Sequence, residues 1–310
     1  MAIKYLITGA TGGLGASILH HLSLQVAKAD LVASSSRASA ASQFEDVGIP
    51  FRQASYDNYT SLVNAFHDVE KLLFVSSPTM DNKQRERQHM NVIKAAKEAG
   101  VKHIYYTSLS FGGHASTSKV LLQLPHLQTE KWLWESSVPF TSVREGVYAE
   151  AFPVFTGWYP ASTEIVLPVD GPIAWVSREE LGEATAKLMF AGSNEFNGKT
   201  VLFTGPKAYT MADILDVVNQ ITGRLVTLKK VSGEEFIRIR TANDEGKKRE
   251  VFFRAQLTWF DGIARGECAA VDPLIEKMLG RPPKDGKEVI RELLQANRDY
   301  TWHQNYKHTI

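Results

Sequence analysis

Four glycines interrupt an apolar run near the start of the chain, in the stretch TGATGGLG at residues 8–15. A tight turn requires a residue without Cβ, and a bound diphosphate requires backbone amides at close approach together with the positive end of a helix. Gly9, Gly12 and Gly15 lie between a β-rich run and a segment of helical spacing. They therefore predict a dinucleotide-binding loop, with a purely structural turn as the alternative. Gly13 is an extra glycine without an assigned role.

Short β-rich runs alternate with longer segments of helical spacing through the first half of the chain, which predicts βαβ units and a parallel sheet. The five runs span residues 3–8, 29–34, 49–55, 71–77 and 102–108. In open α/β sheets ligands bind beyond the carboxyl ends of the strands, so the residues directly after each run are candidates for the site.

The helix after the fourth run has the clearest pattern. Met90, Ile93 and Ala96 recur on one face, Arg85 is expected away from that face, and Gly100 ends the helix. Arg87 and Lys94 are likewise expected away from that face, so the spacing predicts a helix with one apolar contact face.

The second half of the chain returns to the first. Residues 152–172 are rich in proline and aromatic residues, but a helix is predicted over 175–190 and a strand over 199–205. We expect a Rossmann-like, doubly wound α/β sheet with a smaller, interleaved C-terminal α/β subdomain. The dinucleotide-binding unit is expected over 1–150 with 175–205 returning to it, and the substrate-binding unit over 151–174 and 206–310.

The end of the second strand indicates which dinucleotide binds. An NAD-specific site places Asp or Glu there to accept from the ribose 2′-hydroxyl, whereas this chain has Ser34, Ser35, Ser36 and Arg37. An arginine can pair with a 2′-phosphate and serines can donate to it, which favours NADP(H). The alternative is that Arg37 belongs to a solvated loop.

Charge and cysteine content exclude several classes of protein. The 35 Lys and Arg balance 34 Asp and Glu, so no overall field attracts nucleic acid or an anionic membrane. The basic stretch 229–254 also contains acids and is interpreted as a solvated helical face. The single cysteine, Cys268, favours a reducing compartment, and no membrane span or signal pattern is found, so a cytoplasmic location is expected. Adjacent His20 and His21 make a poor chelate, and no metal site is expected.

Several motifs together resemble the NmrA-like branch of the atypical short-chain dehydrogenases, and in particular its NADPH:quinone oxidoreductases. The resemblance runs the length of the chain and extends more distantly to isoflavone and pinoresinol reductases and to festuclavine-type imine reductases. It rests on ITGATGGLG at 7–15, LLFVSSP at 72–78, HMNVIKAAKEAGVKHIYYTSL at 89–109, HLQTEKWLWESSVPFTSVREGVYAE at 126–150 and WVSREELGEA at 175–184.

The resemblance implies a set of cofactor-binding residues. Arg37 matches the residue that contacts the 2′-phosphate, with Ser36 beside it, and Ala54-Ser55-Tyr56 departs from the pattern that flanks the adenine. The phosphate loop and the strand ends that line the cofactor are matched by Gly9, Thr11, Gly12, Gly13, Leu14, Gly15, Ser76, Ser77, Thr107 and Ser108.

The catalytic residues are less clearly indicated. Ordinary short-chain dehydrogenases use a Tyr-x-x-x-Lys pair, but none of the ten tyrosines here has a lysine four residues on. At the position where isoflavone-reductase relatives have a lysine, this chain has His126, which can act as a general acid, position the nicotinamide ribose or bond a carbonyl in the core. Tyr148 fits the family position beside the nicotinamide, or is a rim or core aromatic. Glu130 is expected to orient the loop.

These patterns predict an NADPH-dependent reductase of an electron-poor small molecule such as a quinone, a conjugated enone or an imine. A non-catalytic, NADP(H)-binding redox sensor is the alternative from another class. Five aromatic residues in the loops that would close the pocket suggest a flat, unsaturated substrate, although such residues are also ordinary core material: Phe111, Phe152, Phe155, Trp158 and Tyr159. The oligomeric state is not predicted.

Overall fold

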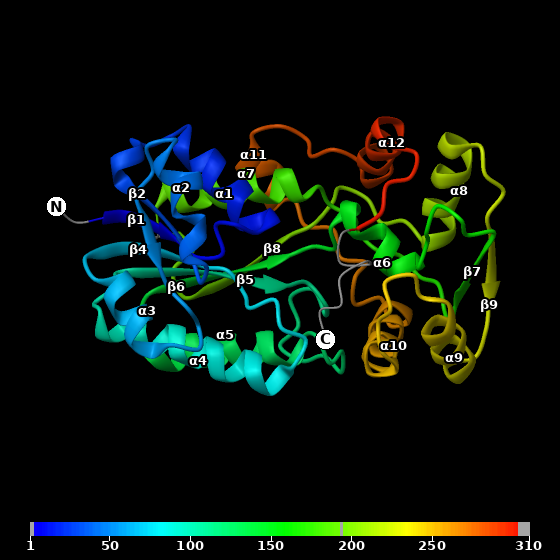
Figure 1. Cartoon of the computed structure of the whole chain (residues 1–310), viewed down its shortest axis with the longest axis horizontal. Helices are drawn as coiled ribbons and strands as arrows, with labels where there is room; N and C mark the ends of the chain where they lie inside the picture. Colours follow the sequence, from blue (N-terminus) through cyan, green and yellow to red (C-terminus); the bar gives the residue numbers. More distant parts are fainter. Residues whose placement is uncertain (1–2, 193–194, 303–310) are drawn as a thin grey trace.

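The computed structural model describes residues 3–192 and 195–302. A large parallel sheet of seven strands has the order β3-β2-β1-β4-β5-β6-β8, which confirms the expected Rossmann-like α/β fold. Its strands are β1 (Ile3–Ile7), β2 (Leu31–Ser35), β3 (Phe51–Gln53), β4 (Val69–Phe74), β5 (His103–Leu109), β6 (Phe140–Glu145) and β8 (Lys199–Phe203). Figure 1 shows the sheet edge-on, with the carboxyl ends of β5 and β6 directed at the second half of the molecule.

Helices cover both faces of this sheet because its central strands are apolar on both sides. One face is covered by α1 (Gly13–Ser23), α2 (Ala41–Glu45), α7 (Arg178–Ala191) and α11 (Leu274–Leu279). The other is covered by α3 (Tyr59–Phe66), α4 (Asn82–Glu98) and α5 (Leu124–Ser136). Helix α11 packs on the large sheet although residues 206–310 were expected in the second unit. The domain limits themselves stay a prediction.

Helix α4 begins and ends as its sequence indicates. The Asp81 carboxylate accepts from the amides of Lys83 and Gln84, which caps the helix, and Gly100 follows it with a φ of 75°. Its buried face differs from the expected one, because Arg85 is only 3% exposed. The expectation that Arg85 lies away from the apolar face was wrong, because Arg85 is buried together with Ile93 and Ala96. The buried face turns toward the polar strand ends as well as the apolar core.

The second unit lies beyond the carboxyl ends of the large sheet (Figure 1). It has a two-stranded parallel sheet and an aromatic core that includes Trp158, Phe236 and Phe260. Its elements are α6 (Phe152–Thr156), β7 (Glu164–Leu167), α8 (Met211–Thr222), β9 (Thr227–Lys230), α9 (Gly233–Asn243), α10 (Glu250–Ala264) and α12 (Gly286–Ala296). None of the helices within the described ranges combines the length and apolar character that a membrane span requires.

Candidate active site

The glycine-rich loop joins β1 to α1 and leaves the first turn of α1 without side-chain caps. Gly9 has a φ of 61°, and a Cβ there would lie 3.1 Å from Cβ of Val75. Gly12 is the N-cap residue, no acidic side chain lies in the first turn, and a Cβ on Gly15 would overlap the Gly9 carbonyl. The helix amides are therefore exposed to a ligand that can approach the bare backbone closely.

Gly13, which the sequence left without a role, provides room for Arg178 at the start of α7. A Cβ on Gly13 would overlap the Arg178 guanidinium. The same guanidinium lies over the ring of Trp302, with Cζ 4.9 Å from the ring centroid. Sequence reasoning missed Arg178 because it is distant in the chain and belongs to a helix that was assigned only a structural role.

The end of β2 presents the residues expected to bind the 2′-phosphate. Ser36 and Arg37 are exposed, and Arg37 has no ion pair with any residue of the described ranges. The Ser35 hydroxyl lies 3.4 Å from Oγ1 of Thr11 and accepts from the Arg37 amide at 3.3 Å. The contact between Thr11 and Ser35 links the phosphate loop to the end of β2. The structure therefore places Arg37 where a ligand on the phosphate loop can extend toward it.

Ser76 joins the end of β4 to Thr107 of β5, and Ser77 joins it to helix α4. The Ser76 amide donates to Oγ1 of Thr107 at 3.0 Å, and the Ser77 amide donates to Nε2 of His89 at 3.0 Å. Since Nε2 accepts, the His89 ring donates from Nδ1 to Thr129, 2.8 Å away. Burial, aided by the charge of Arg85, lowers the pKa of His89 to about 3, so this ring is neutral.

His126 lies in the first turn of α5 and is 2% exposed. Its Nδ1 lies 2.7 Å from the Tyr106 hydroxyl, and within the described residues Nε2 has no hydrogen-bond partner. Burial, with a contribution from the charge of Arg85, holds the pKa of His126 well below its usual range. A neutral ring fits positioning of a ligand more readily than donation from an imidazolium, and the general-acid role stays an untested prediction. The positioning role stays a prediction.

Tyr148 follows β6 and is half-buried between the two hydrophobic cores. Its ring centroid lies 6.5 Å from that of Trp302, and its hydroxyl has no hydrogen-bond partner in the described part of the chain. Burial raises the pKa of Tyr148, so the hydroxyl remains protonated. Tyr148 can therefore donate a hydrogen bond but cannot act as a phenolate base.

Glu130 and Arg144 form a buried ion pair behind the strand ends, 2.6 Å apart. The Ser108 hydroxyl donates to Glu130 at 2.7 Å, so this predicted cofactor residue is engaged with the ion pair. Arg144 also donates to the carbonyls of Gly113 and Ala115. Through Arg144, Glu130 holds the loop after β5, as the sequence led us to expect.

Arg85 is the second arginine that the sequence did not assign to the site. Its Nη2 donates to the Thr79 carbonyl, whereas its Nε and Nη1 are buried without a partner among the described residues. Burial is the main cause of the lowered pKa values of His126 and His89, and the charge of Arg85 adds to it, so Arg85 acts on the same polar cluster. Unpartnered buried cations are rare, because each one loses its hydration without compensation.

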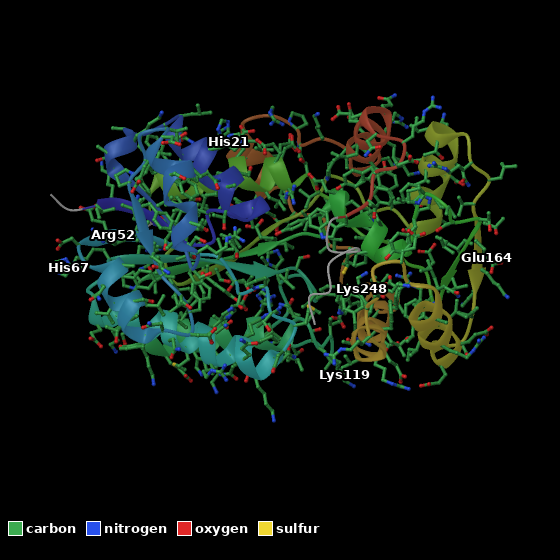
Figure 2. All side chains as sticks on the ribbon, viewed as in Figure 1. His21, Arg52, His67, Lys119, Glu164 and Lys248 are labelled. Carbon is green, nitrogen blue, oxygen red and sulfur yellow. The ribbon has the colours of Figure 1, made fainter. Side chains whose placement is uncertain are left out.

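The five aromatic residues expected around a pocket are instead core material. Phe111, Phe152, Phe155, Trp158 and Tyr159 are all at most 7% exposed. These rings pack in the core, so they give no support to the expectation of a flat substrate. A shallow hollow of about 490 Å³ lies elsewhere, lined in part by Arg52 and His67, which Figure 2 shows at the end of the molecule that is far from the second unit.

The strand ends fit NADP(H). The bare glycine backbone suits a diphosphate, and the exposed, unpaired Arg37 suits a 2′-phosphate. Within residues 3–192 and 195–302 no group of His, Cys, Asp and Glu could hold a metal ion.

Comparison with known proteins agrees with this geometry. The NmrA-like family model matches residues 2–278. The chain is 45% identical over 306 residues to an NmrA-like family domain-containing oxidoreductase, flvB, of Aspergillus flavus, covering 98% of this chain and 99% of the relative. It is 36% identical to quinone oxidoreductase 2 of Escherichia coli, covering 94% and 99%.

The fold is also similar to solved structures of reductases. An NADPH-dependent quinone oxidoreductase from Escherichia coli complexed with NADPH superposes with a TM-score of 0.83 at 30% identity, covering 94% of this chain and 99% of that one. With its glycine loop, its sheet order and a family match over most of its length, the chain belongs to the NmrA-like family.

Proposed function

We propose that this protein is an NADPH-dependent reductase that transfers hydride to an electron-poor small molecule, namely a quinone, a conjugated enone or an imine. When bound, NADPH supplies the hydride. The loop from Gly9 to Gly15 holds the diphosphate and Arg37 holds the 2′-phosphate. A cytoplasmic location is part of the proposal, because the only cysteine, Cys268, is buried and free.

The protonation of the site supports this substrate class. Burial lowers the pKa of His126 and raises the pKa of Tyr148, so His126 lacks the acidic proton of an imidazolium and the Tyr148 hydroxyl is a weaker acid than an ordinary tyrosine. A simple ketone needs such a proton donor when hydride arrives, whereas a quinone, enone or iminium accepts hydride readily without one. The residues of the site then contribute positioning and exclusion of water.

The test is oxidation of NADPH by the full chain with a quinone, an enone, a cyclic imine and a simple ketone. We expect turnover with at least one of the first three and none with the ketone. Arg37→Ala is the control, because it should lose turnover at limiting NADPH. Tight NADPH binding without turnover on any acceptor would favour a redox sensor and contradict the proposal.

A further inference from the structure

We infer that Arg178 is a second phosphate-binding cation of the cofactor site, which pairs with the diphosphate while Arg37 pairs with the 2′-phosphate. The inference rests on the proposed binding of NADP(H). The inference also explains Gly13, because the absence of a side chain there lets the Arg178 guanidinium lie against the phosphate loop.

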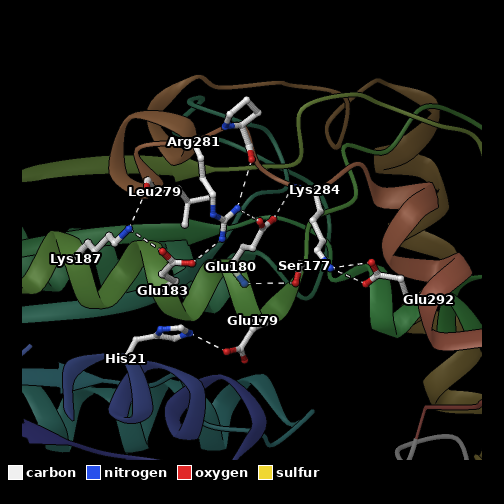
Figure 3. Close-up of polar contacts among 11 residues, drawn as sticks. His21, Ser177, Glu179, Glu180, Glu183, Lys187, Leu279, Arg281, Lys284 and Glu292 are labelled. Atoms are coloured by element: carbon white, nitrogen blue, oxygen red, sulfur yellow. Dashed lines mark hydrogen bonds and ion pairs between the residues drawn. The ribbon is translucent and has the colours of Figure 1, made fainter. Parts of the chain in front are cut away.

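The position of Arg178 is fixed by the contact between α1 and α7. A Cβ on Gly182 would overlap the Ser17 hydroxyl, so the two helices pack closely at this point. Glu179 then accepts from Ser17 at 2.9 Å and lies 2.8 Å from Nε2 of His21, a contact that Figure 3 shows between the two helices. These contacts hold the first turn of α7 against α1. Arg178, which lies in that turn, is therefore beside the glycine-rich loop.

The Arg178 guanidinium has no salt bridge among the described residues, although its charge acts on the neighbouring Glu150 carboxylate and lowers the pKa of that group against the larger effect of burial. No carboxylate lies within ion-pair distance of its guanidinium in the ranges that the structure describes. The Glu150 carboxylate accepts a hydrogen bond from the Arg178 backbone amide, which lies 3.1 Å from each of its two oxygens. Other cations around α7 are paired: Arg281 with Glu180 and Glu183, and Lys187 with Glu183 (Figure 3).

An unpaired guanidinium beside uncapped helix amides forms an anion site with two components. The amides of the first turn of α1 and the planar N–H groups of Arg178 both approach the bare face of the loop. A diphosphate carries two negative charges and several acceptor oxygens, and arginine binds phosphate in a bidentate manner. The Trp302 ring on the guanidinium restricts its movement, so little conformational freedom is lost on binding.

The proposed roles of Arg178 and Arg37 can be separated, because the two residues should bind different phosphate groups of the cofactor. Loss of Arg178 should weaken every ligand that contains the 5′-diphosphate, whereas loss of Arg37 should weaken only ligands with a 2′-phosphate. Four probes distinguish them: NADPH has both groups, NADH and ADP have only the diphosphate, and 2′-AMP has only the 2′-phosphate.

The experiment measures dissociation constants of these probes by calorimetry with the full chain and its Arg178→Ala, Arg37→Ala and Arg281→Ala variants. We expect Arg178→Ala to weaken NADPH, NADH and ADP by about 10- to 100-fold, the range of a charge-assisted pair, and to leave 2′-AMP unchanged. Arg281→Ala removes a paired cation near α7 and should change none of them.

Gly13→Ala is an independent variant, since it should displace the guanidinium without removing it. It should weaken ADP as Arg178→Ala does, and should add little in the Arg178→Ala background. Unchanged ADP binding by folded Arg178→Ala would overturn the inference, as would a loss confined to NADPH and 2′-AMP. If the unaltered protein binds neither NADPH nor ADP, the proposed function fails instead.

Discussion

Tyr106 and His126 contact each other through a buried hydrogen bond, with 2.7 Å between the Tyr106 hydroxyl and Nδ1 of His126. The bond fixes the imidazole ring and occupies one of its two nitrogens. Nε2 is therefore the only ring nitrogen that a ligand can engage. The surrounding apolar packing and the charge of Arg85 keep the ring neutral.

His126→Ala should reduce both turnover and stability. We expect turnover on an accepted quinone or enone to fall by about 10²-fold if Nε2 positions the nicotinamide ribose. We also expect about 1–3 kcal/mol of destabilisation, because the buried Tyr106 hydroxyl loses its partner. Stopped-flow reduction and thermal unfolding measure the two effects, and Tyr106→Phe is the control for the stability loss. A rate per folded molecule equal to that of the unaltered protein would eliminate His126 and leave Tyr148 as the residue to test.

Stability should fall in mild acid because buried histidines are neutral in the fold. The pKa of His89 is about 3 and that of His126 is also lowered, whereas an unfolded histidine titrates near about 6.5. The unfolded chain thus binds more protons as pH drops below about 6.5, so this contribution is complete above that pH and is lost as pH falls toward the folded pKa values. Each ring should contribute a slope of up to about 1.4 kcal/mol per pH unit. Urea unfolding from pH 7 to pH 4.5 should show a smaller slope for His89→Gln; equal slopes would contradict the burial argument.

Glu130→Gln should destabilise the protein by about 3–5 kcal/mol, because it leaves the Arg144 guanidinium buried without its counter-ion. Glu135→Gln is a matched control on the same helix, since Glu135 is exposed and 3.8 Å from Lys131. That change should cost less than about 1 kcal/mol. Denaturant unfolding of both variants checks the difference, and similar losses would mean that the buried pair is no more valuable than the exposed one.

The local parts of this site could be predicted from the sequence and the tertiary parts could not. Some candidate residues directly follow a strand in the sequence, so the spacing along the chain indicates where they lie. These are Gly9, Gly12 and Gly15 after β1 and Arg37 after β2. Arg178 reaches Gly13 only because two distant helices pack together, and no periodicity indicates that contact.

Arg85 illustrates the second reason. The helical pattern of α4 predicted that Arg85 lies away from its apolar face, as expected for a charged residue of an amphipathic helix. The helix in fact lies with Arg85 and His89 toward the strand ends, where polar groups gather. The aromatic residues show the opposite error, because composition cannot distinguish a pocket from a core.

Arg85→Met should raise stability and lower activity. The Arg85 guanidinium is buried with two nitrogens unpartnered among the described residues, so replacing it with an apolar side chain of similar length removes an uncompensated charge. We expect stabilisation of about 1–4 kcal/mol, as for other buried charges replaced by apolar groups. Under the proposed function, hydride addition to a quinone or enone leaves negative charge on oxygen, and the Arg85 charge, which acts on His126, should favour that charge at the same strand ends. Turnover on these acceptors should therefore fall by about 10-fold, less than for loss of a donor in direct contact.

The effect of Arg85→Met should depend on the acceptor and on the position of the arginine. Turnover on an imine should change less than turnover on a quinone, because the imine takes a proton from solvent before it reacts, and hydride addition to the resulting iminium neutralises a positive charge and creates no anion. Arg87→Met is the matched control, since Arg87 is exposed on the same helix, 3.6 Å from Asp57, and should affect neither property. Melting temperature and initial rates on both acceptors are measured side by side. A lower melting temperature with an unchanged quinone rate would show that Arg85 supports the fold and not the reaction.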